Sequence, residues 1–278
     1  MRMLAAGATY KALEDFSVTS NLEMRDDYDQ WLINLDMSLF DTIKNTFDYR
    51  VLECIRALRL SKEIIVIDLS SSMFYYDSDI ISRAVRDRAE KINDDIQTIK
   101  ASAGVDLPAP IQRSYMATPC YYLWWGYLNS ENELVFGGEF CLYSMLYALV
   151  ENEVDFTDPD VPDEEQDTSV WRFFDTHFCS LDNYRAAVRV ADDALDTQVY
   201  VDETGFARFK PLGMDYLEYM EHTIKLAGLY DWPRLFTGEP PAHDPECTEL
   251  AAGLAVLKHA FPETDYSDYE SRLAKLRG

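Results

Sequence analysis

Segments with strand character gather in the middle of this sequence, and helical patterns lie on both sides of them. Tyr121 to Trp125 is an aromatic run of high β propensity, and polar residues 129–132 separate it from a second strand pattern at 134–136. Two such runs joined by a short polar loop predict a β-hairpin. Further short strands are expected at residues 64–67, 170–174, 198–201 and 207–209. This clustering predicts an α+β fold with a central, mainly antiparallel sheet flanked by helices.

Apolar residues recur at spacings of three and four in several other segments, which is typical of amphipathic helices. These helices are expected at residues 26–47, 52–58, 81–99, 215–227, 248–260 and 267–275. Asp215 favours the start of one of them, and Gly228 suits its exit. We therefore expect an N-terminal helical extension over residues 1–80, an α+β domain over 81–240 and a C-terminal helical tail over 241–278.

The balance of charge excludes two classes of partner. The chain has 278 residues with 25 Lys and Arg against 50 Asp and Glu, a formal net charge of −25. Binding to a nucleic-acid backbone or to an anionic membrane surface requires a surplus of basic side chains, so we expect neither. Disordered acidic chains are poor in aromatic residues, whereas 13% of this chain is Phe, Trp or Tyr. The sequence therefore predicts a folded protein with a strongly negative exterior.

Cysteine usage and hydropathy indicate a cytoplasmic protein. The five cysteines are far apart and form no CxxC pair: Cys54, Cys120, Cys141, Cys179 and Cys247. This pattern is typical of reduced thiols and not of a disulfide framework or a zinc ribbon. We find neither a run of apolar residues long enough for a transmembrane helix nor the apolar core of a signal peptide.

The sequence contains no phosphate-binding glycine loop, nucleophile elbow or zinc-protease signature. Gly137 and Gly138 lie in a strand context, where a bulge or a close backbone approach explains them better than phosphate binding. The four histidines lack metal-ligand spacing. We therefore expect no catalytic residue, no metal site and no cofactor.

The most distinctive local feature is an acidic segment. Residues 151–168 contain nine carboxylates and no basic side chain. A calcium loop would need a central glycine that is missing here. A solvated loop and a contact surface for a basic partner both fit, because concentrated negative charge accelerates association with a cationic protein. The candidate partner-binding residues are Asp155, Phe156, Asp158, Asp160, Asp163, Glu164, Glu165 and Asp167.

Several short motifs lie between residues 92 and 236: Leu107-Pro108, Trp124-Trp125, Gly137 to Phe140 leading into Leu142 to Ser144, Trp171 to Phe174, Leu212 to Tyr219 and Trp232-Pro233. Taken together, these motifs resemble the SUKH superfamily, the Smi/Knr-type proteins. The resemblance implies an α+β fold with a curved antiparallel sheet. It also implies a bacterial immunity protein that neutralises a toxin, often one acting on nucleic acids, without catalytic residues of its own.

The leading hypothesis is thus a non-enzymatic, cytoplasmic protein that binds a basic toxin domain and occludes its active site. Two alternatives stay open. One is an enzyme of unrecognised class that uses Asp192 and Asp193 as paired carboxylates or His177 and Cys179 as base and nucleophile. The other is a scaffold or regulatory module that recruits partners without inhibiting them.

Overall fold

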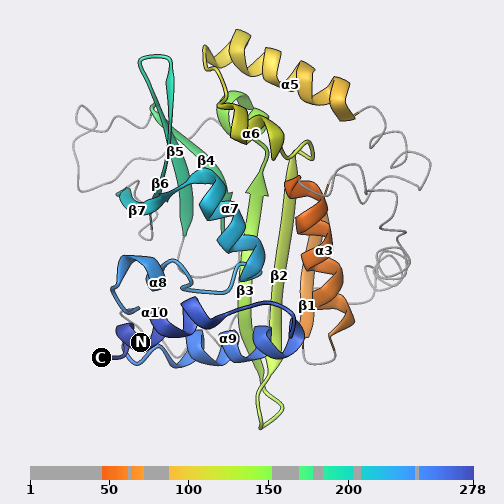
Figure 1. The fold of residues 1–278 in the computed structure, drawn as a ribbon. Coiled ribbons are helices and arrows are strands. Elements are labelled where there is room, and N and C mark those ends of the chain that lie inside the picture. The colour runs from red at the N-terminus through yellow and green to blue at the C-terminus, as the bar shows by residue number, and fades with distance from the viewer. Residues whose placement is uncertain are drawn as a thin grey trace, which may run out of the picture. The chain divides into compact units, whose positions relative to one another are not determined.

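The computed structural model describes residues 46–61, 64–71, 88–151, 169–177, 184–202, 208–241 and 244–278 (Figure 1). All of these residues belong to one compact unit of the chain. In order, the elements are α3 (Phe47–Leu60), β1 (Ile64–Ser71), α5 (Arg88–Ala103), α6 (Ala109–Arg113), β2 (Cys120–Leu128), β3 (Leu134–Tyr143), the π-helix η3 (Tyr147–Glu151), β4 (Trp171–Thr176), β5 (Arg185–Ala191), β6 (Ala194–Asp202), β7 (Lys210–Asp215), α7 (Tyr216–Lys225), α8 (Arg234–Thr237), α9 (Thr248–Ala260) and α10 (Ser267–Leu276).

The seven described strands form one sheet whose spatial order, β1 to β7, is also their order along the chain. Every neighbouring pair is antiparallel. The expected fold class, α+β with a central antiparallel sheet flanked by helices, is therefore confirmed. Among the described strands β7 lies at an edge of the sheet, where Pro211 is tolerated because an edge strand need not donate every backbone hydrogen bond.

The join between β3 and β4 is narrow. The register pairs Leu142 with Asp175 and no other residues of these two strands. The Asp175 carboxylate adds a second link, because it accepts a hydrogen bond of 2.9 Å from the backbone amide of Cys141. A side chain thus takes the place that a ladder hydrogen bond would occupy between these strands.

The β2–β3 hairpin confirms the expectation for Gly137 and Gly138. The strand register shifts at this point, because Trp125 pairs with Gly138 and Gly126 pairs with Phe136, which leaves Gly137 in a bulge. A Cβ atom on Gly138 would lie 2.5 Å from the carbonyl oxygen of Gly228. Both expected reasons for glycine, a bulge and a close backbone approach, therefore operate here.

The first described helix and strand join the central sheet. α3 buries one apolar face, with Val51, Leu52, Ile55 and Leu58 inaccessible to solvent. β1 pairs with β2 along its length, and α3 contacts both β1 and α7. The domain boundary expected at residue 80 therefore falls between two paired strands, and residues 46–71 belong to the same compact unit as the sheet. Residues 1–45 of the expected extension lie outside the described part of the chain.

The helices at the end of the chain match the expectation closely. Asp215 caps α7 through a capping box: its carboxylate accepts from the Glu218 amide, and the Glu218 carboxylate accepts from the Asp215 amide, both at 2.9 Å. α9 has the expected bounds, and α10 ends one residue later than expected. Figure 1 shows α3 and α7 beside each other in front of the sheet, and α9 and α10 running across the direction of β2 and β3.

One strand was not expected, and the expected position of another was wrong. β5 was not expected, because three of its seven residues are alanine, which is depleted in strands. The last strand was expected at residues 207–209, but β7 spans Lys210–Asp215. Pro211 and Gly213 within β7 argue against a strand when the sequence is read alone, since their penalty is small only at an edge.

Candidate functional site

The acidic segment lies outside the described residues, and its two ends are anchored in the sheet region. All eight candidate partner-binding residues fall within positions 152–168: Asp155, Phe156, Asp158, Asp160, Asp163, Glu164, Glu165 and Asp167. η3 ends at Glu151, and the described chain resumes at Ser169, directly before β4. The structure therefore fixes where this segment leaves the fold and where it returns.

The return point lies beside a second group of carboxylates. Val190 near the end of β5 donates a backbone hydrogen bond of 2.8 Å to the carbonyl of Val170. Two residues further on, Asp192 and Asp193 form the turn between β5 and β6. Both of these side chains and that of Asp196 are exposed. We call Asp192, Asp193 and Asp196 the acidic tip.

The backbone explains why aspartates occupy this turn. Asp192 and Asp193 have φ angles of 52° and 59°, and they are the two central residues of a two-residue hairpin connection. Positive φ at both positions is required by the turn whose twist suits a β-hairpin, and Asp tolerates this conformation better than most residues. Their role in the turn is conformational, and their carboxylates face solvent.

An aromatic cluster borders the acidic tip. The ring of Trp171 lies 5.0 Å from that of Tyr200 and 4.3 Å from that of Phe209, and all three side chains are half-buried. The Tyr200 hydroxyl donates a hydrogen bond of 3.1 Å to the Asp196 carboxylate, which links the cluster to the tip. Trp171 also pairs in register with Arg189, an exposed basic residue close to the tip.

We therefore define the candidate site as the acidic tip, the aromatic cluster (Trp171, Tyr200 and Phe209) and the return point of the acidic segment. Half-exposed aromatic rings supply apolar contact area, and the carboxylates of the acidic tip supply charge and hydrogen-bond acceptors. Such an arrangement can bind a basic surface that carries an apolar centre. The sequence missed the aromatic part, because Trp171 on β4, Tyr200 on β6 and Phe209 just before β7 meet only in the folded sheet.

His177 is poorly suited to act as a general base. Its ring stacks on Tyr184 at 4.7 Å, and its Nε2 atom is buried without a hydrogen-bond partner among the described residues. Burial lowers the pKa of His177 to about 3. A base with so low a pKa removes protons weakly at neutral pH. Its expected partner Cys179 lies outside the described residues.

The most strongly perturbed carboxyl group lies in the core. Asp175 is fully buried and accepts hydrogen bonds from the Cys141 amide at 2.9 Å and the Tyr219 hydroxyl at 2.8 Å. Burial and, secondarily, the nearby charge of Glu139 raise the pKa of Asp175 to about 7 against the pull of these hydrogen bonds. Glu139 is itself buried and accepts from the Tyr230 hydroxyl at 3.3 Å. Sequence reasoning missed this pair, although an Asp at the end of an aromatic strand run is a signal worth testing.

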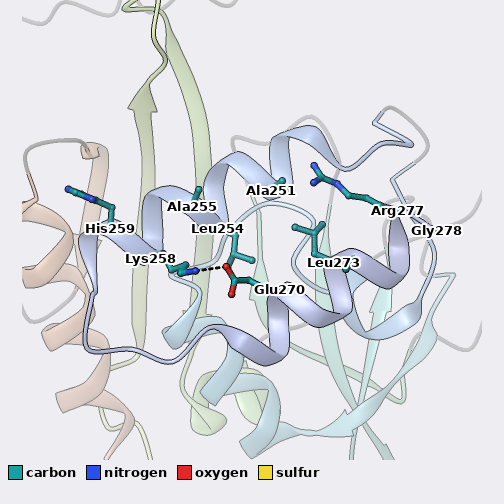
Figure 2. A pocket seen from close by; sticks show the side chains of 10 residues that line it. Ala251, Leu254, Ala255, Lys258, His259, Glu270, Leu273, Arg277 and Gly278 are labelled. Atoms are coloured by element: carbon teal, nitrogen blue, oxygen red, sulfur yellow. Dashed lines mark hydrogen bonds and ion pairs between the residues drawn. The ribbon is translucent and has the colours of Figure 1, made fainter.

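A groove of about 950 Å³ runs between α9 and α10 (Figure 2). Its polar lining residues are engaged with the protein itself. Lys258 forms an ion pair with Glu270 at 2.5 Å, and Arg277 donates to the backbone carbonyls of Glu246 and Cys247 at 2.9 and 3.0 Å. Leu254 and Leu273 form the buried floor. These contacts show that the charged side chains of the groove hold the C-terminal helices to each other and to the neighbouring backbone.

Among the residues that the structure describes, no group of three or more His, Cys, Asp or Glu side chains is arranged to hold a metal ion. The helices in the same ranges are all too short or too polar to cross a membrane. No family model, curated protein or solved structure matches this chain.

Proposed function

We propose that this protein is an immunity protein of the SUKH type that binds a basic toxin domain and neutralises it by covering the toxin's active site. The binding surface would be the candidate site together with the acidic segment that enters it. The protein would act in the cytoplasm, where a toxin that attacks nucleic acids finds its target.

One observation carries this proposal: a half-buried aromatic cluster borders the exposed carboxylates of the acidic tip, close to the point where the chain returns from the acidic segment to the sheet. Concentrated charge accelerates encounter with a partner of opposite charge, but affinity depends mainly on a few well-packed anchors. Trp171 and Tyr200 would provide such anchors, and the carboxylates would occupy the positions that substrate phosphates take in the toxin.

The architecture supports the same proposal. An α+β fold built on an antiparallel sheet flanked by helices is what the SUKH resemblance implies, and the described chain has this fold. Fold alone does not carry function, so the weight of the proposal rests on the site.

The experiment is co-expression with the product of a toxin gene adjacent to the gene for this protein. One variant replaces Asp192, Asp193 and Asp196 by Asn, and a second replaces the seven acidic candidates in residues 155–167 by Asn or Gln. A control removes three exposed carboxylates elsewhere, with Glu131→Gln, Glu239→Gln and Glu263→Gln. We expect the first two variants to slow association by about tenfold or more at low salt, and the control to change it little.

A Trp171→Ala variant separates charge from anchoring. We expect it to accelerate dissociation, because loss of an aromatic anchor typically costs about 2 kcal/mol or more of binding free energy. Unchanged protection and complex formation in both acidic variants at physiological salt would refute the electrostatic part of the proposal. A gene neighbourhood without a toxin, together with metal-dependent activity of the purified protein, would favour the enzyme alternative instead.

A further inference from the structure

Two thiols face each other across the β2–β3 hairpin. Cys120 pairs in register with Tyr143, and Cys141 pairs with Tyr122, so the two cysteines are diagonal neighbours on the same face of the sheet. Their sulfur atoms are 3.4 Å apart. The other described cysteines have different surroundings: the Cys54 thiol donates to the carbonyl of Ile224, and Cys247 occupies the N-cap position of α9 without a side-chain hydrogen bond to the helix.

The two thiols differ in access. Cys141 is 2% exposed and lies in a cluster with Tyr122 and Trp124, whereas Cys120 is half-buried at the first position of its strand. The hydrogen bond with Cys120 and burial both raise the pKa of the Cys141 thiol, which keeps it protonated. A reagent from solvent therefore reaches Cys120 first, and Cys141 is the second thiol to react.

We propose that Cys120 and Cys141 are a redox modification site that forms a reversible intrachain disulfide with a small-molecule or protein disulfide as oxidant. The Cys120 thiolate attacks one sulfur of the oxidant, which breaks the oxidant's S–S bond and releases one thiol. Cys141, after losing its proton, attacks the Cys120 sulfur of this mixed disulfide and releases the second thiol. Two cysteine thiols are thereby oxidised, one disulfide is reduced to two thiols, and both protons end on those thiols.

The geometry favours a bond that forms and also breaks. A disulfide requires a sulfur–sulfur distance of about 2.0 Å, so the two side chains must approach by more than an ångström. Diagonal positions on neighbouring strands are typically about 7–8 Å apart, just beyond what a disulfide spans without backbone movement, so closing this bridge would strain the hairpin. Strained bridges have higher reduction potentials and are the labile, regulatory kind. A labile bond also suits a reducing compartment, where stable disulfides are rare.

The experiment treats the reduced full-length protein with oxidised glutathione and counts free thiols by maleimide labelling and peptide mass mapping. We expect the wild type to lose two thiols, to gain a crosslink between the Cys120 and Cys141 peptides with a mass loss of about 2 Da, and to recover both thiols with a dithiol reductant. Cys54→Ser should behave as the wild type does.

Two variants test the order of events. Cys141→Ser should retain glutathione on Cys120, because no second thiol resolves the mixed disulfide. In Cys120→Ser, we expect Cys141 to stay unmodified or to react with glutathione roughly tenfold more slowly than Cys120 does in the wild type, since the buried thiol is less accessible. A stable glutathione adduct on wild-type Cys120, or a bridge from either thiol to Cys54, Cys179 or Cys247, would overturn the proposal. The wild-type mapping decides the matter even if a variant fails to fold.

Discussion

The hydroxyl of Tyr219 on α7 donates a hydrogen bond of 2.8 Å to the carboxylate of Asp175 on β4, and both side chains are fully buried. The same hydroxyl lies 3.2 Å from that of Tyr184, and the other Asp175 oxygen accepts from the Cys141 amide. One carboxyl group thus ties a helix to two strands. Because it is so thoroughly buried, its protonation should be visible in the stability of the protein.

The first prediction concerns pH. The pKa of Asp175 is about 7 in the folded protein and 3.8 in a free side chain. Between these values the folded protein holds a proton that the unfolded chain releases, so this group's contribution to the free energy of unfolding falls as pH rises. The stability of the wild type relative to Asp175→Asn should therefore decrease by about 1.4 kcal/mol per pH unit from about pH 4.5 to 6.5. Urea denaturation of both proteins across this pH range measures the difference in their free energies of unfolding. The same pH dependence in both proteins would contradict the prediction.

The second prediction concerns two glycines. In Gly138→Ala the new methyl would lie 2.5 Å from the backbone carbonyl oxygen of Gly228 and 2.8 Å from the Trp125 indole nitrogen, so the backbone must move. We expect a loss of roughly 3 kcal/mol, the upper end of the usual cost of overpacking. Gly238→Ala is the matched control: its Cβ meets nothing within 4 Å, and its φ of 74° costs about 1 kcal/mol. Equal losses for the two variants would argue against the close approach.

The third prediction compares two buried tryptophans. Trp125 donates a hydrogen bond of 2.7 Å to the carbonyl of Ala227, whereas the Trp232 indole nitrogen has no hydrogen-bond partner among the described residues. Both side chains are fully buried. Trp125→Phe should cost about 1–3 kcal/mol more than Trp232→Phe, because it alone leaves a buried carbonyl without its donor. Chemical denaturation of the two variants gives the difference in stability. A larger cost for Trp232→Phe would contradict the prediction that the Trp125 hydrogen bond is the one that stabilises the core.

The fourth prediction concerns the start of α3. Asp48 is 1% exposed and accepts hydrogen bonds from the amides of Ala117 and Thr118 and from the Tyr121 hydroxyl. Asp48→Ala would leave these buried donors without an acceptor, at a cost of about 3 kcal/mol or more. Glu53→Ala, an exposed position in the same helix, should stay within about 0.5 kcal/mol of the wild type. Thermal unfolding of both variants tests whether this carboxylate joins α3 to the approach to β2.

The helices were predictable where local signals mark their ends. Asp215 caps the start of α7 by a hydrogen-bond exchange with Glu218, only three positions away. Pro262 follows the end of α9. Such signals act over one helical turn and need no knowledge of the fold. The β2–β3 hairpin was predictable for the same reason, because both its strands and its turn are contiguous in the sequence.

The site was less predictable because its parts meet only through the sheet. The aromatic cluster comes from different segments of the chain, those of Trp171, Tyr200 and Phe209. β5, the strand that lies between those of Trp171 and Tyr200 in the sheet, has no local sequence pattern that predicts it. The burial of Asp175 likewise depends on Tyr219, which is 44 residues away in the chain. Local patterns report the propensity of a segment, whereas the environment of a side chain is a tertiary property.

The single-pair join between β3 and β4 has a mechanical consequence. On either side of it the strands are held by extended ladders, so the sheet consists of two stiff blocks, β1–β3 and β4–β7. Tension applied across the sheet would load one backbone pair, Leu142 with Asp175, and one side-chain bond, Asp175 to Cys141. The sheet would part there first, and the force required would depend on the charge of a single aspartate.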